Sequence, residues 1–370
     1  MHSSDPDGDE SELTIVDTDV HVNYVHPDMQ RAVAQRLPEP YRTRLDPDTA
    51  QGFRFAYPGH HWVGETPGKD SAHTMPVTEP DAHVQQPVCE ELGVDYPILN
   101  TAPSFVDHLP RERARAEMKA ANDVLLDRFL DEYDHFYGLC TVATTEPDKA
   151  AEELDRMGSE RQIVGAFIES GGPDKPLGNP RYDVLYQAAQ DNDLPIVTHG
   201  FSGAAVQWDF PTLVRDLENW LAVRTLSHPF SQMLHLTSMI YQGVPEKFPD
   251  LNFVFLEAGI GWIPYMIGRL NRGYKQRRDW APLLERTPEE YLRESFYIGT
   301  QPIGEPNDRR HMHQLLQMVG PEMLMFSTDH PHYDFDSPSA LVDRYLAPFS
   351  RAEQDRILAG NAREVFGVPR

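Results

Sequence analysis

The sequence predicts a (β/α)8 barrel, and three observations lead to that prediction. Short apolar segments alternate along the chain with segments whose apolar residues recur at helical spacing. Three of the apolar segments, Leu13–Val16, Leu194–Val197 and Met323–Phe326, run directly into residues that bind metals. A doubly wound open sheet is the alternative, but residues 17–23 contain no glycine and therefore lack a nucleotide-binding turn.

The predicted strands are apolar and rich in β-branched or aromatic residues. In chain order they are Leu13–Thr18, Val94–Asn100, Phe136–Val142, Ile163–Glu169, Pro195–His199, Asn252–Glu257, Ser295–Thr300 and Met323–Thr328. The predicted helices carry apolar residues three or four positions apart. They are Arg111–Asp131, Asp148–Met157, Pro180–Asn192, Phe210–Val223, Ser231–Tyr241, Trp262–Gln276 and Asp308–Val319, with a turn at His228-Pro229. Eight strands that alternate with helices favour a barrel over a sandwich or a helical bundle.

We expect one barrel domain over residues 13–370, preceded by a disordered acidic segment at 1–12. Residues 24–80 are too long for a simple loop after the first strand and are rich in proline, glycine, histidine and aromatic residues. A loop of this length within a compact domain is usually a functional lid or disordered. The aromatic residues and the helical spacing at Met29–Arg36 favour an ordered, lid-like insertion.

The formal net charge is −25, and only six of the 33 basic residues are lysine. This composition is typical of a halophilic protein from a high-salt cytoplasm, where ions screen the repulsion between carboxylates; an ordinary acidic cytosolic protein is the alternative. Phosphate binding needs a basic surface, so we expect no nucleic-acid partner. Residues 1–12 lack the apolar core of a signal peptide, and no apolar run approaches a membrane span. We therefore expect a soluble, cytoplasmic protein that does not associate with membranes.

Four residues at the ends of predicted strands form a plausible site for one metal ion. Asp19 and His21 are two positions apart, so in a strand they point to the same face. His199 and Asp329 end the predicted fifth and eighth strands, where barrel enzymes place their chemistry. Carboxylate oxygens and imidazole nitrogens in this number suit a single divalent ion. Asp17 could support a ligand by hydrogen bonding or cap the strand end.

The motifs around these residues resemble those of amidohydrolase-related enzymes of the aminocarboxymuconate-semialdehyde decarboxylase type. The matching segments extend over nearly the whole chain in the order that the family keeps. They are residues 15–21 (IVDTDVH), 243–251 (GVPEKFPDL), 255–264 (FLEAGIGWIP), 326–332 (FSTDHPH) and 357–367 (ILAGNAREVFG). The resemblance implies a distorted barrel that often pairs into a homodimer or a higher homo-oligomer.

The resemblance also implies one divalent metal ion, zinc in the first place and otherwise manganese or iron. Carried over position by position, Asp19, His21, His199 and Asp329 would be its ligands. Asp329 would in addition accept a proton from a water molecule made more acidic by the ion.

One departure from the family concerns the end of the sixth strand, where decarboxylases of this type commonly carry a catalytic histidine. Here that position holds Glu257, which could bind the metal, transfer a proton, or pair with a basic side chain. His228, expected in the loop after the fifth strand, is the nearest replacement imidazole. We therefore treat Asp329, Glu257 and His228 as the candidate catalytic residues.

Three further residues are candidates for binding a carboxylated substrate. His330 and His332 flank Pro331 next to Asp329, and either could line the pocket or only hydrogen-bond a neighbouring loop. Arg54, in the insertion, could hold a substrate carboxylate through two parallel hydrogen bonds.

The sequence therefore predicts a metal-dependent enzyme of the amidohydrolase superfamily. The first expectation is a non-oxidative decarboxylase (a carboxy-lyase) acting on a small carboxylated, unsaturated or aromatic substrate. The alternative is a hydrolase of a lactone, ester or amide, in which water attacks the carbonyl with Asp329 as the base. A third possibility is a barrel without catalytic activity that binds a partner.

Overall fold

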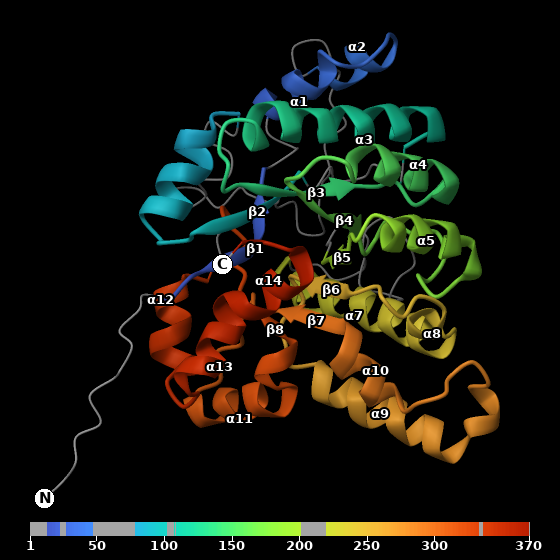
Figure 1. Cartoon of the computed structure of the whole chain (residues 1–370), viewed down its shortest axis with the longest axis vertical. Helices are drawn as coiled ribbons and strands as arrows, with labels where there is room; N and C mark the ends of the chain where they lie inside the picture. The colour runs from blue at the N-terminus through green and yellow to red at the C-terminus, as the bar shows by residue number, and fades with distance from the viewer. Residues whose placement is uncertain are drawn as a thin grey trace, which may run out of the picture.

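The computed structural model describes residues 13–22, 27–46, 78–101, 107, 109–200, 220–332 and 336–369. Eight parallel strands form one sheet in sequence order from β1 to β8 (Figure 1). Their bounds are β1 Val16–His21, β2 Tyr96–Asn100, β3 Tyr137–Thr141, β4 Ile163–Glu169, β5 Ile196–His199, β6 Phe253–Leu256, β7 Phe296–Gly299 and β8 Leu324–Met325. This order, with each strand paired to its sequence neighbours, confirms the predicted barrel.

The barrel is closed between its first and last strands by a short set of hydrogen bonds. The Thr18 amide donates to the carbonyl of Phe326 at 3.1 Å, just beyond β8, and the Asp329 amide donates to the carbonyl of Asp19 at 3.0 Å. The His21 amide donates to the carbonyl of His330 at 2.8 Å. These bonds hold the segment after β8 against β1, so residues from opposite ends of the chain share one rim.

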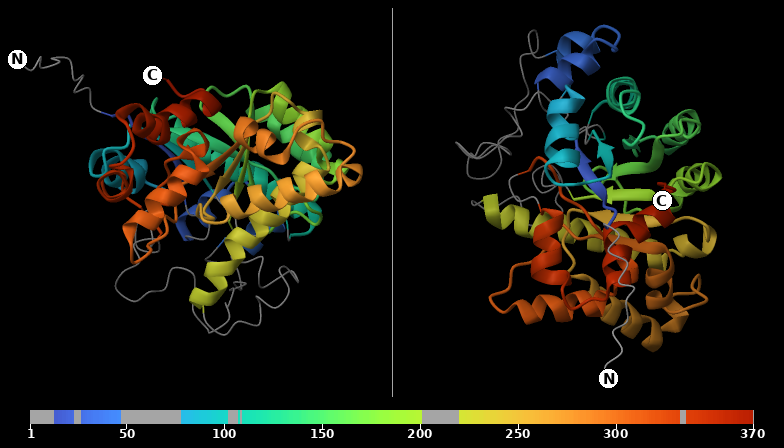
Figure 2. Two further views of the ribbon diagram at one scale, coloured as in Figure 1. Left: turned by 90° about the horizontal axis from the view of Figure 1, so that it is seen from below. Right: turned by 60° about the vertical axis from the view of Figure 1, so that its left-hand side comes forward.

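Helices surround the strands in both views of Figure 2. Before β5 their bounds are α1 Pro27–Ala34, α2 Tyr41–Leu45, the π-helix η2 Asp81–Glu90, α3 Arg111–Leu125, its π-helical continuation η4 Leu126–Leu130, α4 Pro147–Met157, the 3-10 turn η5 Pro180–Tyr182 and α5 Asp183–Asp191. After β5 they are α7 Trp220–Tyr241, α8 Val244–Lys247, α9 Ile263–Gln276, η7 Arg278–Trp280, α10 Pro288–Ser295, α11 Arg309–Val319, η8 Pro321–Met323, α12 Pro338–Leu341, η9 Val342–Leu346, α13 Arg351–Asp355, η10 Arg356–Gly360 and α14 Asn361–Phe366.

The molecule has two hydrophobic cores. The larger lies between the outward faces of the strands and the helices, and it includes Phe253, Phe255 and Phe296, whose rings pack on one another. The smaller lies inside the barrel, where strand residues such as Phe167 and Val197 meet Phe366 of α14. The C-terminal helix thus fills the interior from one end and leaves the strand ends on the opposite rim for the site.

Two predictions about local structure are wrong. The first strand was expected to end at Thr18, but β1 continues through His21, so Asp19 and His21 lie within it. A turn was expected at His228-Pro229, but α7 is one helix that runs through Pro229, and its first turns project beyond the barrel in Figure 2. A proline removes one helical hydrogen bond, yet here the packing of α7 on the barrel outweighs that local cost.

Several other predicted features lie partly or wholly outside the described residues. The segment at 1–12, residues 47–77 of the insertion and residues 210–219 of one predicted helix lie outside the described residues. The described part of the insertion holds α1, close to the predicted helical stretch Met29–Arg36, and α2. Among the described helices, none is both long enough and apolar enough to cross a bilayer.

Candidate metal centre

The four predicted ligands meet at one rim of the barrel. Asp19 and His21 come from β1, His199 is the last residue of β5, and Asp329 follows β8. One donor atom from each lies within 4.8 Å of the others. The His21 Nε2 atom is 3.3 Å from Asp19 Oδ1 and 3.0 Å from Asp329 Oδ1, and His199 Nε2 is 3.3 Å from Asp19 Oδ2. The strands therefore gather side chains that are 310 positions apart in sequence.

Three of these donor atoms are buried without a hydrogen bond from any residue that the structure describes. They are Asp19 Oδ2, His21 Nε2 and His199 Nε2. Buried polar atoms are almost always paired, because an unpaired one loses its hydration without compensation. Two imidazoles and two carboxylates at this spacing are the donor set that divalent zinc, manganese or iron accepts. The residues present therefore fit one divalent cation.

The charges of the donors depend on one another. Burial alone would raise the pKa of Asp19, but His199 and His21 outweigh it and hold that pKa below its usual value. Burial alone would lower the pKa of His21, yet Asp19 and Asp329 keep it well above its ordinary value, and the pKa of His199 is raised in the same way by Asp19 and Glu257. The carboxylates therefore favour the protonated form of both imidazoles, and a cation that binds here competes with those protons.

Two amide side chains that sequence reasoning missed orient the carboxylate ligands. Asn100 Nδ2, at the end of β2, donates to Asp19 Oδ1 at 2.8 Å. Gln301 Nε2, just after β7, donates to Asp329 Oδ2 at 3.0 Å. Both residues follow strands at the rim that holds the ligands, so the same strand-end reasoning could have identified them.

Asp17 does not join the ligand group but ties its two carboxylate-bearing segments together. Its carboxylate accepts hydrogen bonds from the Asp19 amide at 3.1 Å, from the Thr328 amide at 2.9 Å and from the Thr328 hydroxyl at 2.6 Å. A bulge between Asp17 and Val20 in β1 re-aims side chains along that strand. Burial raises the pKa of Asp17 to about 7, against the effect of these donors.

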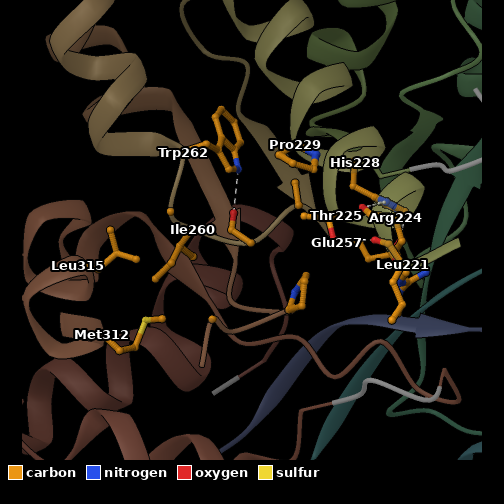
Figure 3. Close-up of a pocket in the computed structure, with 15 residues that line it drawn as sticks. Leu221, Arg224, Thr225, His228, Pro229, Glu257, Ile260, Trp262, Met312 and Leu315 are labelled. Carbon is orange, nitrogen blue, oxygen red and sulfur yellow. Dashed lines mark hydrogen bonds and ion pairs between the residues drawn. The ribbon is translucent and has the colours of Figure 1, made fainter. Parts of the chain in front are cut away.

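Glu257, His228 and Arg224 form a second polar group beside the four donors. Figure 3 shows these three side chains together. Glu257 follows β6, and its Oε2 atom lies 3.4 Å from His199 Nε2 and 3.2 Å from His228 Nε2. Arg224 donates to Glu257 Oε1 at 2.6 Å and lies 3.5 Å from Asp329 Oδ2. Burial alone would raise the pKa of Glu257, but His228 and Arg224 hold it well below its ordinary value. Glu257 is therefore an ionised carboxylate.

His228 reaches this group from α7 rather than from the predicted loop. Residue 200 has to be glycine for this approach, because a Cβ atom there would stand 2.1 Å from His228 Cδ2 and 2.4 Å from the Glu257 carbonyl oxygen. Arg224 lies one helical turn before His228 on the same helix, and no sequence pattern had indicated it as a site residue.

The backbone is strained at two of the carboxylates. Glu257 has φ of 51° and Asp329 has φ of 64°, in the left-handed region that residues with a side chain seldom adopt. Such conformations cost on the order of 1–3 kcal/mol each and cluster at functional sites. Glu257 follows β6 and Asp329 follows β8, and the left-handed backbone at each residue turns its carboxylate toward the rim.

Of the three predicted substrate-binding residues, His332 lies beside the donors and His330 is buried away from them. His332 Nδ1 lies 2.5 Å from Asp329 Oδ1, and its side chain is 20% exposed. His330 is buried, and its Nε2 atom pairs with the carbonyl of His83 in η2 at 3.1 Å, so it contacts a neighbouring helix and not the loop given above as the alternative. Burial lowers the pKa of His330 to about 3. Arg54 lies outside the described residues.

Comparison with known proteins points to one family. Residues 16–368 match the sequence model of the family described as amidohydrolase. A gamma-resorcylate decarboxylase from Rhizobium is 27% identical over 334 residues, which cover 86% of this chain and 94% of that protein. A 2-amino-3-carboxymuconate-6-semialdehyde decarboxylase from Dictyostelium discoideum is 22% identical, covering 78% of this chain and 77% of that protein.

Solved structures share the fold over almost the full length. A 5-carboxyvanillate decarboxylase from Sphingomonas paucimobilis superimposes with a TM-score of 0.71 at 22% identity, covering 97% of this chain and 100% of that one. A dihydroxybenzoic acid decarboxylase from Polaromonas, solved with bound manganese and the inhibitor 2-nitroresorcinol, gives a TM-score of 0.64 at 18% identity and covers 97% and 98% of the two chains.

Proposed function

The chain belongs to the amidohydrolase family, and from that membership we propose that it is a metal-dependent, non-oxidative decarboxylase of a small aromatic or unsaturated carboxylate. The observation that carries the proposal is the convergence of four donor atoms within 4.8 Å, three of them buried and without a hydrogen bond among the described residues. The decarboxylases among its relatives support the choice of reaction.

Asp19, His21, His199 and Asp329 would hold the metal ion. The two imidazoles make zinc our first expectation, while the two carboxylates suit manganese equally well. The structure of the Polaromonas decarboxylase contains bound manganese. Bound there, a divalent cation would act as a Lewis acid toward an oxygen of the substrate. Asn100 and Gln301 keep the two carboxylates in place for that task.

Loss of CO2 breaks a carbon–carbon bond, leaves the electron pair on the substrate carbon and requires that this carbon take up one proton. Glu257 is ionised, so it is not itself the proton donor; its Oε2 atom lies 3.2 Å from His228 Nε2. We assign proton delivery to the pair of His228 and Glu257, with His228 as the group that carries the proton. His332, partly exposed beside Asp329, would contact the substrate, and His330 would hold η2 against the segment after β8.

Metal analysis and activity assays on matched variants test this assignment. We expect one equivalent of divalent metal in the purified protein, and loss of both metal and activity in His21→Ala and His199→Ala. His228→Gln should keep the metal and lose about 100-fold to 10,000-fold in kcat, the range for removal of a general acid. A His228→Gln variant with unchanged kcat, or full CO2 release after chelation, would contradict the proposal.

Hydrolysis is a second candidate, favoured by Glu257 at the position where the decarboxylases that this chain resembles carry histidine. In that reaction Asp329 would accept a proton from the attacking water. Its carboxylate oxygens are held by contacts with His21, His332 and Gln301. Assays for CO2 release from carboxylates, run beside assays for acid release from lactones, esters and amides, separate the two reactions.

We also propose that the protein works in a high-salt cytoplasm and pairs with a second copy of itself. The net charge of −25 and the scarcity of lysine support the first part. Light scattering in 2 M KCl against 0.1 M KCl would test the second: a dimer in high salt is expected, and a monomer in both conditions would contradict it.

A further inference from the structure

A cavity of about 550 Å³ opens beside the metal centre, between α7, the turn after β6, the loop after β7 and α11 (Figure 3). Its two ends differ in chemistry. Arg224, His228 and Glu257 lie at one end, whereas Ile260, Trp262, Met312 and Leu315 lie together at the other.

The far end is apolar despite the indole that lines it. Trp262 Nε1 donates to the Gly259 carbonyl at 2.8 Å, so the polar atom of the ring is paired within its own turn. Ile260 and Met312 contribute only hydrocarbon and a thioether, and both are buried residues of the cavity wall. A wall of this kind favours a hydrocarbon group over water or a charged group.

The polar end borders the metal centre through Glu257 and Arg224. Glu257 lines the cavity and lies 3.4 Å from His199, a predicted ligand. Arg224 contacts both Glu257 and Asp329, so its positive charge offsets the carboxylates that an anionic substrate would otherwise meet. A molecule whose carboxylate passes between Glu257 and Arg224 to the metal centre would place its remaining part in the apolar end.

The size of the cavity limits what that part can be. A dry apolar cavity of about 150 Å³ accommodates benzene. The volume of about 550 Å³ found here is several times larger than the volume that a single ring requires. We propose, resting on the decarboxylase function above, that the substrate is an aromatic carboxylate with an apolar substituent of several carbons, which occupies the pocket lined by Ile260, Trp262, Met312 and Leu315.

A homologous series of carboxylates tests the proposal in the metal-loaded enzyme. The probes are 2,6-dihydroxybenzoate and its 4-methyl, 4-propyl and 4-pentyl derivatives. Burial of each methylene group should raise kcat/KM by about fourfold in the wild type. Leu315→Trp fills the apolar end, so kcat/KM in this variant should not rise along the series.

A matched control comes from the same helix. Met318 on α11 is 54% exposed and does not line the cavity, so Met318→Trp adds the same indole and should keep the full gain. A series that is flat in the wild type, or that keeps its gain in Leu315→Trp, would overturn the proposal even if the enzyme is a decarboxylase.

Binding measurements separate failure of this inference from failure of the proposed function. The 5-alkylresorcinols, which are the same compounds without the carboxylate, should bind more tightly with chain length in calorimetry, with the trend lost in Leu315→Trp and kept in Met318→Trp. That result without any CO2 release would uphold the apolar pocket and overturn the decarboxylase assignment. Resorcinol affinities that do not depend on chain length would overturn the pocket.

Discussion

At the scale of single residues, Asp17 shows how one buried side chain can stabilise a fold and a site together. It accepts three hydrogen bonds, from the backbone next to Asp19 and from Thr328, the residue before Asp329. Since β1 meets the segment after β8 in a single β-bridge, between Val20 and His330, the Asp17 carboxylate supplies part of the connection that closes the barrel.

We therefore expect Asp17→Ala to lower the free energy of unfolding by about 3 kcal/mol or more, because it leaves buried donors unpaired. Asp17→Asn keeps an acceptor oxygen of the same size and should cost only about 1 kcal/mol. Urea unfolding of both variants measures the difference. Equal losses in the two variants would show that the hydrogen bonds of Asp17 do not hold the closure.

His235 provides a residue-scale prediction about pH. Burial lowers its pKa from 6.5 to about 4, and the neutral ring accepts from the Leu177 amide and pairs with the Ser170 carbonyl. The unfolded chain therefore binds a proton at higher pH than the folded one. The contribution to stability is complete above pH 6.5 and falls as pH drops toward 4, by about 3 kcal/mol in total.

Urea unfolding between pH 7.5 and 4 measures this slope. His235→Gln cannot titrate and should show a shallower loss of stability over that window than the wild type. His311→Gln, at an exposed position of α11, serves as the control and should follow the wild-type slope. An unchanged slope in His235→Gln would contradict the prediction.

At the scale of elements, the approach of α7 to the end of β5 decides whether His228 reaches the site. Gly200 leaves the space for His228 and for the Glu257 carbonyl, and any side chain there would push helix and strand apart. We expect Gly200→Ala to destabilise the protein by about 1–3 kcal/mol, as overpacking does, and to reduce activity at least tenfold through the displaced His228.

Gly268 offers the matched control for that substitution. It lies inside α9, and a Cβ atom there would have no neighbour within 4 Å. Gly268→Ala should therefore stabilise the protein by about 0.5–1 kcal/mol, because alanine loses less backbone freedom in a helix. Thermal unfolding and activity assays on both variants check the pair, and an active Gly200→Ala protein of normal stability would show that the contact is not tight.

At the scale of the whole molecule, the net charge of −25 determines how stability responds to salt. The screening length falls from about 10 Å at 0.1 M salt to about 3 Å at 1 M, which weakens the repulsion between surface carboxylates. We expect the melting temperature at pH 7 to rise by several degrees between 0.1 and 2 M KCl. The rise should shrink near pH 5, close to the isoelectric point of about 4.9, where the net charge vanishes. A melting temperature that does not change with KCl at pH 7 would contradict this.

The sequence alone determined the barrel, the order of its strands and the four residues that converge on one rim. Strand and helix periodicities are local properties, and parallel strands present their carboxyl ends together, so residues such as His199 and Asp329 could be placed without coordinates. Only the tertiary structure decided that α7 runs unbroken through His228, that Arg224 reaches Glu257, and that His330 turns to His83. These contacts depend on the position of a helix relative to a strand end and on the path of a loop, which arise from packing between distant segments and leave no periodic trace in the chain.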